Sequence, residues 1–186
     1  LDALAEASEV ADGLVGPDAP DAMQQHSREM AEAGLPSILD PGQNIVLFSG
    51  EQLLEMIDRA PVLVCNDYEA ELICDKTGLT LAQLAARVDT LIVTRGAEGS
   101  IVWQKGTEQT IAPVPAAAVK DPTGCGDAYR AGLLLAMATG RSLLDGARLG
   151  SVLGSIKIAV QGCQNHRPTR EEIRAQFEQH YGAWPF

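Results

Sequence analysis

Short apolar, β-branched runs alternate with segments that carry helix start and stop signals along most of this chain. One expected strand ends near Pro17, and three more cover residues 35–39, 61–65 and 91–94. The expected helices cover residues 18–33, 50–58 and 81–88, and a further helix carries Glu69. Such alternation favours a mostly parallel sheet with helices on both of its faces. The sequence therefore predicts an α/β fold, three layers deep in the order α/β/α around a mostly parallel central sheet, in a single domain over residues 1–186.

The last third of the chain departs from this alternation. Residues 100–104 and 109–112 read as two strands around the turn Lys105–Glu108, which predicts a small antiparallel hairpin. Three helices are expected after it, one at 128–139, one through the small-residue segment 150–160 and one at 170–180.

The segment between Asp121 and Gly132 combines a glycine turn, an acidic residue and the start of an apolar helix. Glycines at 124 and 126 permit backbone angles that let successive N–H groups converge on one point. At the N-terminus of a helix, such N–H groups and the helix dipole attract phosphate oxygens. Asp127, in the first helical turn, is placed to accept the proton of a hydroxyl that attacks phosphorus. The alternative is an ordinary loop-to-helix junction in which Asp127 is the N-cap.

The run Asp121-Pro122-Thr123-Gly124-Cys125-Gly126-Asp127-Ala128-Tyr129-Arg130-Ala131-Gly132 resembles the C-terminal signature of the PfkB, or ribokinase-like, family of carbohydrate and nucleoside kinases. Within that family it is most similar to the bacterial adenosine kinases. The resemblance implies a ribokinase-like fold, Asp127 as catalytic base and the turn Gly124–Cys125–Gly126 as the anion hole. It also implies a monovalent-cation site beside Asp121 and Thr123.

A second match is Cys65-Asn66-Asp67-Tyr68-Glu69, which resembles the family's Asn-x-x-Glu motif. Asn66 and Glu69 stand three apart, where an apolar run gives way to a helix, and together they are suited to order water around Mg²⁺. The resemblance also brings Asn66 to the nucleotide. The alternative is a capping box, with Asn66 as N-cap and Glu69 reaching back to it.

A third match covers Leu91 to Ser100, where a β-branched strand runs into a glycine-containing loop. The resemblance implies that Thr94, Gly96 and Gly99, together with Gly126, contact ATP, and ligands do gather at the carboxyl ends of strands in open α/β sheets. The alternative for this loop is a tight turn that joins two strands.

Further along the chain, the resemblance brings Ser151 near the adenine pocket, although small residues there also suit close helix packing. It makes the segment that contains Gly162 the closing side of the cation site.

Composition excludes several functional classes. A net charge of −11 and a pI near 4.6 argue against nucleic acid as the main partner. The sequence shows no apolar stretch of membrane-spanning length and no secretory signal, which predicts a cytoplasmic protein without a membrane partner. The four cysteines are scattered, as in a reduced protein. Cys125 is expected to be a small filler in the turn, and a catalytic thiol is the alternative.

The similarity is confined to the C-terminal part of the family. The chain begins at Leu1 inside an amphipathic stretch, and the family's first strands, lid and glycine-rich substrate motif have no counterpart in it. Without a lid, water has access to a phosphoryl-transfer site, and missing strands expose a sheet edge. We therefore expect poor turnover from these 186 residues alone.

Together these observations predict an ATP- and Mg²⁺-dependent kinase that acts on a small-molecule alcohol, above all the 5′-hydroxyl of adenosine. A ribokinase- or fructokinase-like sugar kinase is the alternative within the same chemistry, and a non-catalytic nucleotide-binding module is the alternative outside it. A requirement for K⁺ and a homodimer of the full-length protein both stay open at this stage.

Overall fold

The computed structural model describes residues 12–186, and the amphipathic start expected at Leu1 lies outside them. The chain divides into two compact units. The first runs up to Arg95 and includes Ile101–Thr110, and the second comprises Gly96–Ser100 and Ile111–Phe186. The single-domain organisation stays a prediction.

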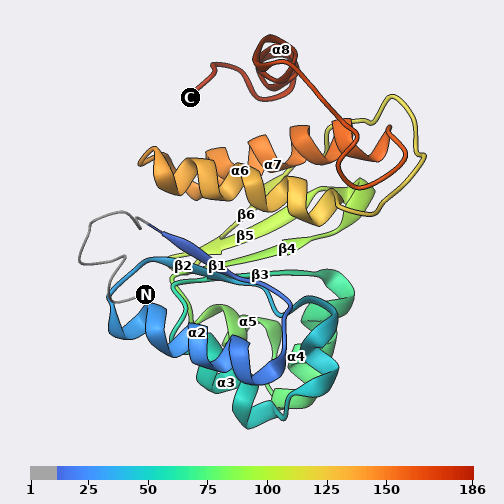
Figure 1. The fold of residues 1–186 in the computed structure, drawn as a ribbon. Coiled ribbons are helices and arrows are strands. Elements are labelled where there is room, and N and C mark those ends of the chain that lie inside the picture. The colour runs from blue at the N-terminus through green and yellow to red at the C-terminus, as the bar shows by residue number, and fades with distance from the viewer. Residues whose placement is uncertain (1–11) are drawn as a thin grey trace. The chain divides into compact units, whose positions relative to one another are not determined.

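A six-stranded sheet forms the centre of the first unit (Figure 1). Its strands lie side by side in chain order: β1 (Gly13–Val15), β2 (Ser37–Leu39), β3 (Val62–Asn66), β4 (Thr90–Thr94), β5 (Ser100–Gln104) and β6 (Thr107–Ile111). The first four strands are parallel, as the strand–helix alternation predicts. The α/β class and the mostly parallel sheet are confirmed.

The helices of the first unit cover one face of this sheet (Figure 1). They are α2 (Pro20–Glu32), α3 (Gly50–Ile57), α4 (Asp67–Thr77) and α5 (Leu81–Ala85), with a 3₁₀ segment η1 (Gly42–Leu47) between β2 and α3. Alternate strand residues such as Leu63, Cys65, Leu91 and Val93 point to the same side of the pleat and join the helices in one apolar core. This core fixes the carboxyl ends of β2, β3 and β4 at one edge of the sheet.

The second unit contains a short 3₁₀ helix, η2 (Gly96–Glu98), and a group of α-helices. Its helices are α6 (Cys125–Ala138), α7 (Leu143–Ile158) and α8 (Arg170–Tyr181). Helices α6 and α7 touch through glycines: a Cβ on Gly132 would lie 2.5 Å from the backbone nitrogen of Gly150. The small residues of α7 therefore serve close helix packing. Val152 and Phe177 lie in a second core, where the Phe177 ring meets that of Trp184 edge-on at 5.3 Å.

The hairpin differs from the sequence expectation in its turn. Only Lys105 and Gly106 connect β5 to β6, and both have positive φ, 51° and 76°. Two residues with positive φ make the turn whose twist matches the flanking strands. Thr107 and Glu108, expected in the turn, instead open β6, because polar side chains suit an edge strand.

Over residues 12–186, no helix combines the length and the apolar character that a membrane crossing requires.

Candidate active site

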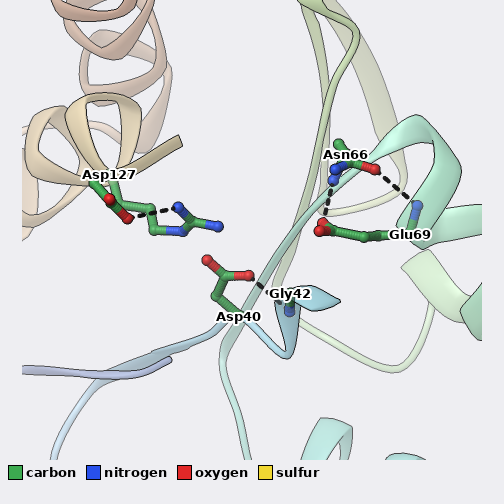
Figure 2. A network of polar contacts seen from close by, with 6 residues as sticks. Asp40, Gly42, Asn66, Glu69 and Asp127 are labelled. Carbon is green, nitrogen blue, oxygen red and sulfur yellow. Dashed lines mark hydrogen bonds and ion pairs between the residues drawn. The ribbon is translucent and has the colours of Figure 1, made fainter. Parts of the chain in front are cut away.

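Polar side chains collect at the carboxyl edge of the sheet in the first unit. Asn66 ends β3 and is paired in register with Thr94, which ends β4. The Asn66 Oδ1 atom accepts a hydrogen bond from the backbone N–H of Glu69 at 2.8 Å, and the Glu69 Oε2 atom accepts one from the backbone N–H of Asn66 at 2.8 Å (Figure 2). The capping box is thus present, and it fixes both side chains at this edge.

The same pair bears on the Mg²⁺ expected from the sequence. Among residues 12–186, no three His, Cys, Asp or Glu side chains come together as a metal cage. One carboxylate and one amide oxygen fit a cation that keeps most of its water and takes its other ligands from phosphate. The Glu69 carboxylate retains its second oxygen for such a contact. The donor set therefore fits a hydrated Mg²⁺ and not a fully protein-ligated one.

Asp40 is a carboxylate at this edge that the sequence analysis did not single out. It follows β2 directly, is 0% exposed, and its Oδ1 atom accepts a hydrogen bond from the backbone N–H of Gly42 at 3.1 Å (Figure 2). In the sequence, Asp40-Pro41-Gly42 reads as an ordinary turn. The position of Asp40 directly after a buried strand was the signal that could have identified it.

The glycine turn begins α6 in the second unit. Gly124 is the N-cap, with φ 85°, and no side chain caps the helix. A Cβ on Gly124 would lie 3.1 Å from both the Cβ and the carbonyl oxygen of Cys163, so another residue here would be crowded as well as strained by the positive φ. Asp127 stands at the third helical position with 83% of its side chain exposed. The alternative in which Asp127 is the N-cap therefore does not describe this helix.

The backbone amides of the turn differ in what they donate to. The N–H of Cys125 donates to the carbonyl oxygen of Pro122 at 3.1 Å. The N–H groups of Gly124, Gly126 and Asp127 donate to no acceptor within the described part of the chain. The open amides are therefore those of Gly124, Gly126 and Asp127, whereas the sequence analysis assigned the hole to Gly124, Cys125 and Gly126.

Asp127 has a cationic neighbour one helical turn further on. The Arg130 Nη1 atom lies 3.2 Å from the Asp127 Oδ1 atom, in an ion pair of the i, i+3 kind (Figure 2). The Arg130 side chain is only 17% exposed, and burial lowers the pKa of its guanidinium. The pair holds one oxygen of Asp127 in place while the carboxylate stays accessible to solvent. The i, i+3 spacing was the sequence signal for this contact.

Cys125 does not have the surroundings of a reactive thiol. Burial is the largest influence on it and raises the pKa of the Cys125 thiol, although the nearby Lys157 acts in the opposite direction. The Sγ atom faces the carbonyl oxygen of Gly154 at 3.9 Å. A nucleophilic thiol needs a lowered pKa, so this geometry favours the small filler.

Asp121 closes the base of the turn by accepting N–H groups. Its Oδ1 atom accepts from the backbone N–H of Thr123 at 2.9 Å, and its Oδ2 atom from the backbone N–H of Gly162 at 2.8 Å and the Gln161 side chain at 3.1 Å. The N–H groups of Thr123 and then Gly162 are the main reasons that the pKa of Asp121 falls to about 2. Gly162 thus contacts Asp121 through its backbone N–H, and the place of this segment in a cation site stays a prediction.

The remaining expected nucleotide contacts lie in both units. Thr94 ends β4 in the first unit. In the second unit Gly96 begins η2 and Gly99 follows it, both with positive φ. Ser151 lies in α7, where its hydroxyl donates to the carbonyl oxygen of Ala147 at 3.1 Å. Their roles toward a nucleotide stay predictions.

Comparisons with known proteins agree with the motifs. The model of the pfkB family of carbohydrate kinases matches residues 3–170. The nucleoside kinase of Methanocaldococcus jannaschii is 36% identical over 141 residues, which cover 76% of this chain and 47% of that protein. The chain thus spans about half the length of this curated relative.

Solved structures extend the likeness. Burkholderia thailandensis nucleoside kinase, in complex with inosine, has a TM-score of 0.93 and 45% identity, covering 97% of this chain and 61% of that one. A further structure of that kinase is a complex with ADP-inosine. Arabidopsis thaliana ribokinase, with ribose and ATP, shares the fold at a TM-score of 0.77 and 24% identity; 95% of this chain and 59% of that one are covered. With its family model matched over 168 of 186 residues (from 3 to 170), this chain belongs to the pfkB family of carbohydrate kinases.

Proposed function

We propose that the protein is a nucleoside kinase, which transfers the γ-phosphoryl group of ATP to a hydroxyl of a nucleoside, with the 5′-hydroxyl of adenosine as the expected acceptor. The observation that carries the proposal is the start of α6, where open backbone amides stand next to the exposed carboxylate of Asp127. An anion hole and a general base are the two parts that phosphoryl transfer to an alcohol needs.

In the proposed reaction the acceptor hydroxyl oxygen forms a bond to the γ-phosphorus of ATP, and the bond from that phosphorus to the bridging oxygen breaks. ADP leaves, and the hydroxyl proton passes to the Asp127 carboxylate. The amides of Gly124, Gly126 and Asp127 hold the charge on the transferred group. Arg130 keeps the carboxylate oriented through its ion pair. General-base assistance of this kind contributes about 10²–10⁴-fold to the rate.

Mg²⁺ would be held through water by Glu69 and Asn66, and when bound it neutralises phosphate charge. The capping box supports this role because it fixes both side chains at the carboxyl edge of the sheet before any ligand arrives. Thr94, which is paired with Asn66 in register, is the proposed nucleotide contact on the neighbouring strand.

The nature of the acceptor is supported by the relatives. The nucleoside kinases of Methanocaldococcus jannaschii and Methanothermobacter thermautotrophicus are 36% and 33% identical to this chain, and the Burkholderia thailandensis enzyme was solved with inosine. Curated ribokinases match at 28–29% identity. A purine nucleoside is therefore favoured over a free sugar, and adenosine and inosine are the acceptors to compare first.

The deciding experiment offers adenosine, inosine, ribose and fructose separately to the purified full-length protein with Mg²⁺–ATP and measures ADP and the phosphorylated product. We expect kcat/KM for a nucleoside to exceed that for either sugar by at least about tenfold, the factor that corresponds to 1.4 kcal/mol of transition-state binding. Higher kcat/KM for ribose or fructose would replace the nucleoside assignment by a sugar kinase. ATP binding with no phosphorylated product from any acceptor would support a non-catalytic nucleotide-binding module.

A further inference from the structure

A fully buried lysine lies behind the glycine turn. Lys157, near the end of α7, is 0% exposed, and a lysine is almost never buried so completely unless its charge is paired. Its Nζ atom donates to the carbonyl oxygen of Asp121 at 2.9 Å and to that of Val160 at 3.2 Å. The ammonium is thus held by backbone oxygens inside the second unit.

These carbonyl groups belong to the two segments that frame the turn. Asp121 precedes it, and Val160 begins the segment that packs against it, where Cys163 approaches Gly124. The two segments are joined a second time, because the backbone N–H groups of Lys120 and Asp121 both donate to the carbonyl oxygen of Ile158. Lys157 therefore connects the segment that precedes the glycine turn with the segment that begins at Val160.

A protonated amine and a monovalent metal cation suit the same kind of site, because both are compact single charges that bind carbonyl oxygens. A tethered ammonium differs in one respect, since it is present at any salt concentration.

We propose that the Lys157 ammonium is a built-in monovalent cation, which takes the place beside Asp121 where the sequence analysis left room for K⁺. Lys157 then acts as a positioning residue: it fixes the turn in the conformation that leaves the amides of Gly124, Gly126 and Asp127 open. Its effect on turnover rests on the proposed kinase function, whereas its exclusion of K⁺ does not.

The donor set around Asp121 does not fit a second cation. Two backbone oxygens are already bound by the ammonium, and three N–H donors occupy the two oxygens of the Asp121 carboxylate. A K⁺ ion added here would also meet the positive charge of Lys157, and like charges at contact distance repel.

The first test needs only the unaltered protein. Its unfolding temperature and its nucleoside-dependent ADP formation are measured in potassium chloride and in N-methylglucamine chloride at equal ionic strength. We expect the two salts to give the same unfolding temperature, and rates that agree within about twofold, a difference of about 0.4 kcal/mol. A multiple-fold activation by potassium, or stabilisation by potassium alone, would overturn the proposal.

The second test removes the ammonium. Lys157→Ala opens a space lined by the carbonyl groups of Asp121 and Val160, and Lys157→Met removes the charge but keeps most of the volume. We expect both variants to lose kcat more than they change KM, because the turn and not the substrate contacts is displaced. Potassium or methylammonium should restore part of kcat and of the unfolding temperature in Lys157→Ala, and much less in Lys157→Met. A folded Lys157→Ala that responds to neither cation would count against the assignment.

The control is a second lysine that binds carbonyl groups in the same way. The Lys76 Nζ atom donates to the carbonyl oxygens of Val46 and Phe48 at 3.2 and 2.7 Å, in the first unit. Lys76→Ala should lower the unfolding temperature without creating a response to potassium. An equal response in both variants would reveal a general salt effect and overturn the proposal.

Failure of the two proposals can be told apart. If no acceptor is phosphorylated but Lys157→Ala gains potassium-dependent stability, the kinase function fails and the built-in cation stands. If turnover is robust and the unaltered protein requires potassium, the built-in cation fails and the kinase function stands.

Discussion

Helices α4 and α6 begin in opposite ways. At the start of α4, the side chains of Asn66 and Glu69 satisfy each other's backbone N–H groups. At the start of α6, Gly124 offers no side chain, and the N–H groups of Gly124, Gly126 and Asp127 donate to no acceptor in the described part of the chain. At a capped N-terminus, side chains of the protein accept hydrogen bonds from backbone N–H groups. At an uncapped one, those N–H groups and the helix dipole are available to an external anion. The α4 start is thus suited to hold side chains still, and the α6 start to bind phosphate.

Helix α7 sharpens this comparison because it repeats the acidic feature of α6 at a start that a side chain caps. Asp145 stands at the third position of α7 and pairs with Arg148 at 2.9 Å, as Asp127 pairs with Arg130 in α6. The hydroxyl of Ser142 caps α7 and accepts the N–H of Asp145. An acidic residue at this helix position is therefore ordinary, and only its combination with an uncapped turn is specific to α6.

The largest expected effect comes from Asp127→Asn. We expect kcat to fall by about 10²–10⁴-fold with ATP affinity retained, because the amide cannot accept the hydroxyl proton while the turn stays intact. Steady-state kinetics and an ATP titration measure the two quantities. Asp145→Asn, at the matching position of α7, should leave kcat within about twofold, since the shared ion-pair geometry is structural and surface pairs contribute little. Retained turnover in Asp127→Asn would remove this residue from the mechanism.

Gly124→Ala tests whether the turn itself matters. The positive φ costs a non-glycine residue roughly 1–2 kcal/mol, and the new Cβ would crowd Cys163 at 3.1 Å. Because displaced amides no longer meet the transferred group, kcat should drop as well, by up to about 10²-fold. Gly78→Ala is the matched control: Gly78 has φ 70° at the end of α4, and a Cβ there meets nothing within 4 Å. It should cost stability alone, and an equal loss of kcat in both variants would contradict the special role of the turn.

Local chemistry made the capped starts predictable from sequence. Ser49 and Thr80 are each followed three residues later by Gln, and the expected helix starts are confirmed with both halves of the capping box present. Asn66 and Glu69 fit the same rule. Such contacts span a single helical turn, so neighbouring residues determine them. The parallel sheet was also predictable, because strand–helix alternation along a chain permits few topologies.

Long-range contacts and the exact conformation of the glycine turn were not predictable in this way. Lys157 lies between Ile156 and Ile158 and gives no local sign that its ammonium is buried, because one of its partners, the carbonyl of Asp121, is 36 residues away. Asp40 looked like a turn residue because its burial depends on neighbouring strands. The Cys125 amide was assigned to the anion hole, and only the conformation of the turn revealed its bond to Pro122. These three features depend on distant parts of the chain or on the conformation of the turn, and residue type alone does not reveal them.

Asn66→Ala distinguishes the helix-capping role of Asn66 at the start of α4 from a role in Mg²⁺ binding. Loss of the cap should cost about 1 kcal/mol of unfolding free energy, as should Thr80→Ala at the start of α5. If Asn66 also orders water around Mg²⁺, only Asn66→Ala should raise the Mg²⁺ concentration needed for half-maximal rate. Chemical denaturation and a Mg²⁺ titration measure the two effects. An unchanged Mg²⁺ requirement in both variants would leave Asn66 with a capping role alone.

The smallest expected effect concerns the acid limit of stability. The pKa of Asp121 is lowered from 3.8 to about 2, chiefly by the N–H groups of Thr123 and Gly162. A lowered pKa in the folded state means that the ionised carboxylate stabilises the protein above about pH 4 and that this contribution is lost as the pH falls toward 2. The stability advantage of the unaltered protein over Asp121→Asn should therefore shrink across that window in urea unfolding. Gln161→Ala, which removes a side-chain donor but leaves both backbone N–H groups, should keep the original profile. If the unfolding free energies of the unaltered protein and of Asp121→Asn changed with pH in parallel, the N–H groups of Thr123 and Gly162 would not bind the carboxylate in solution. Those two N–H groups would then be as open as the amides of Gly124, Gly126 and Asp127.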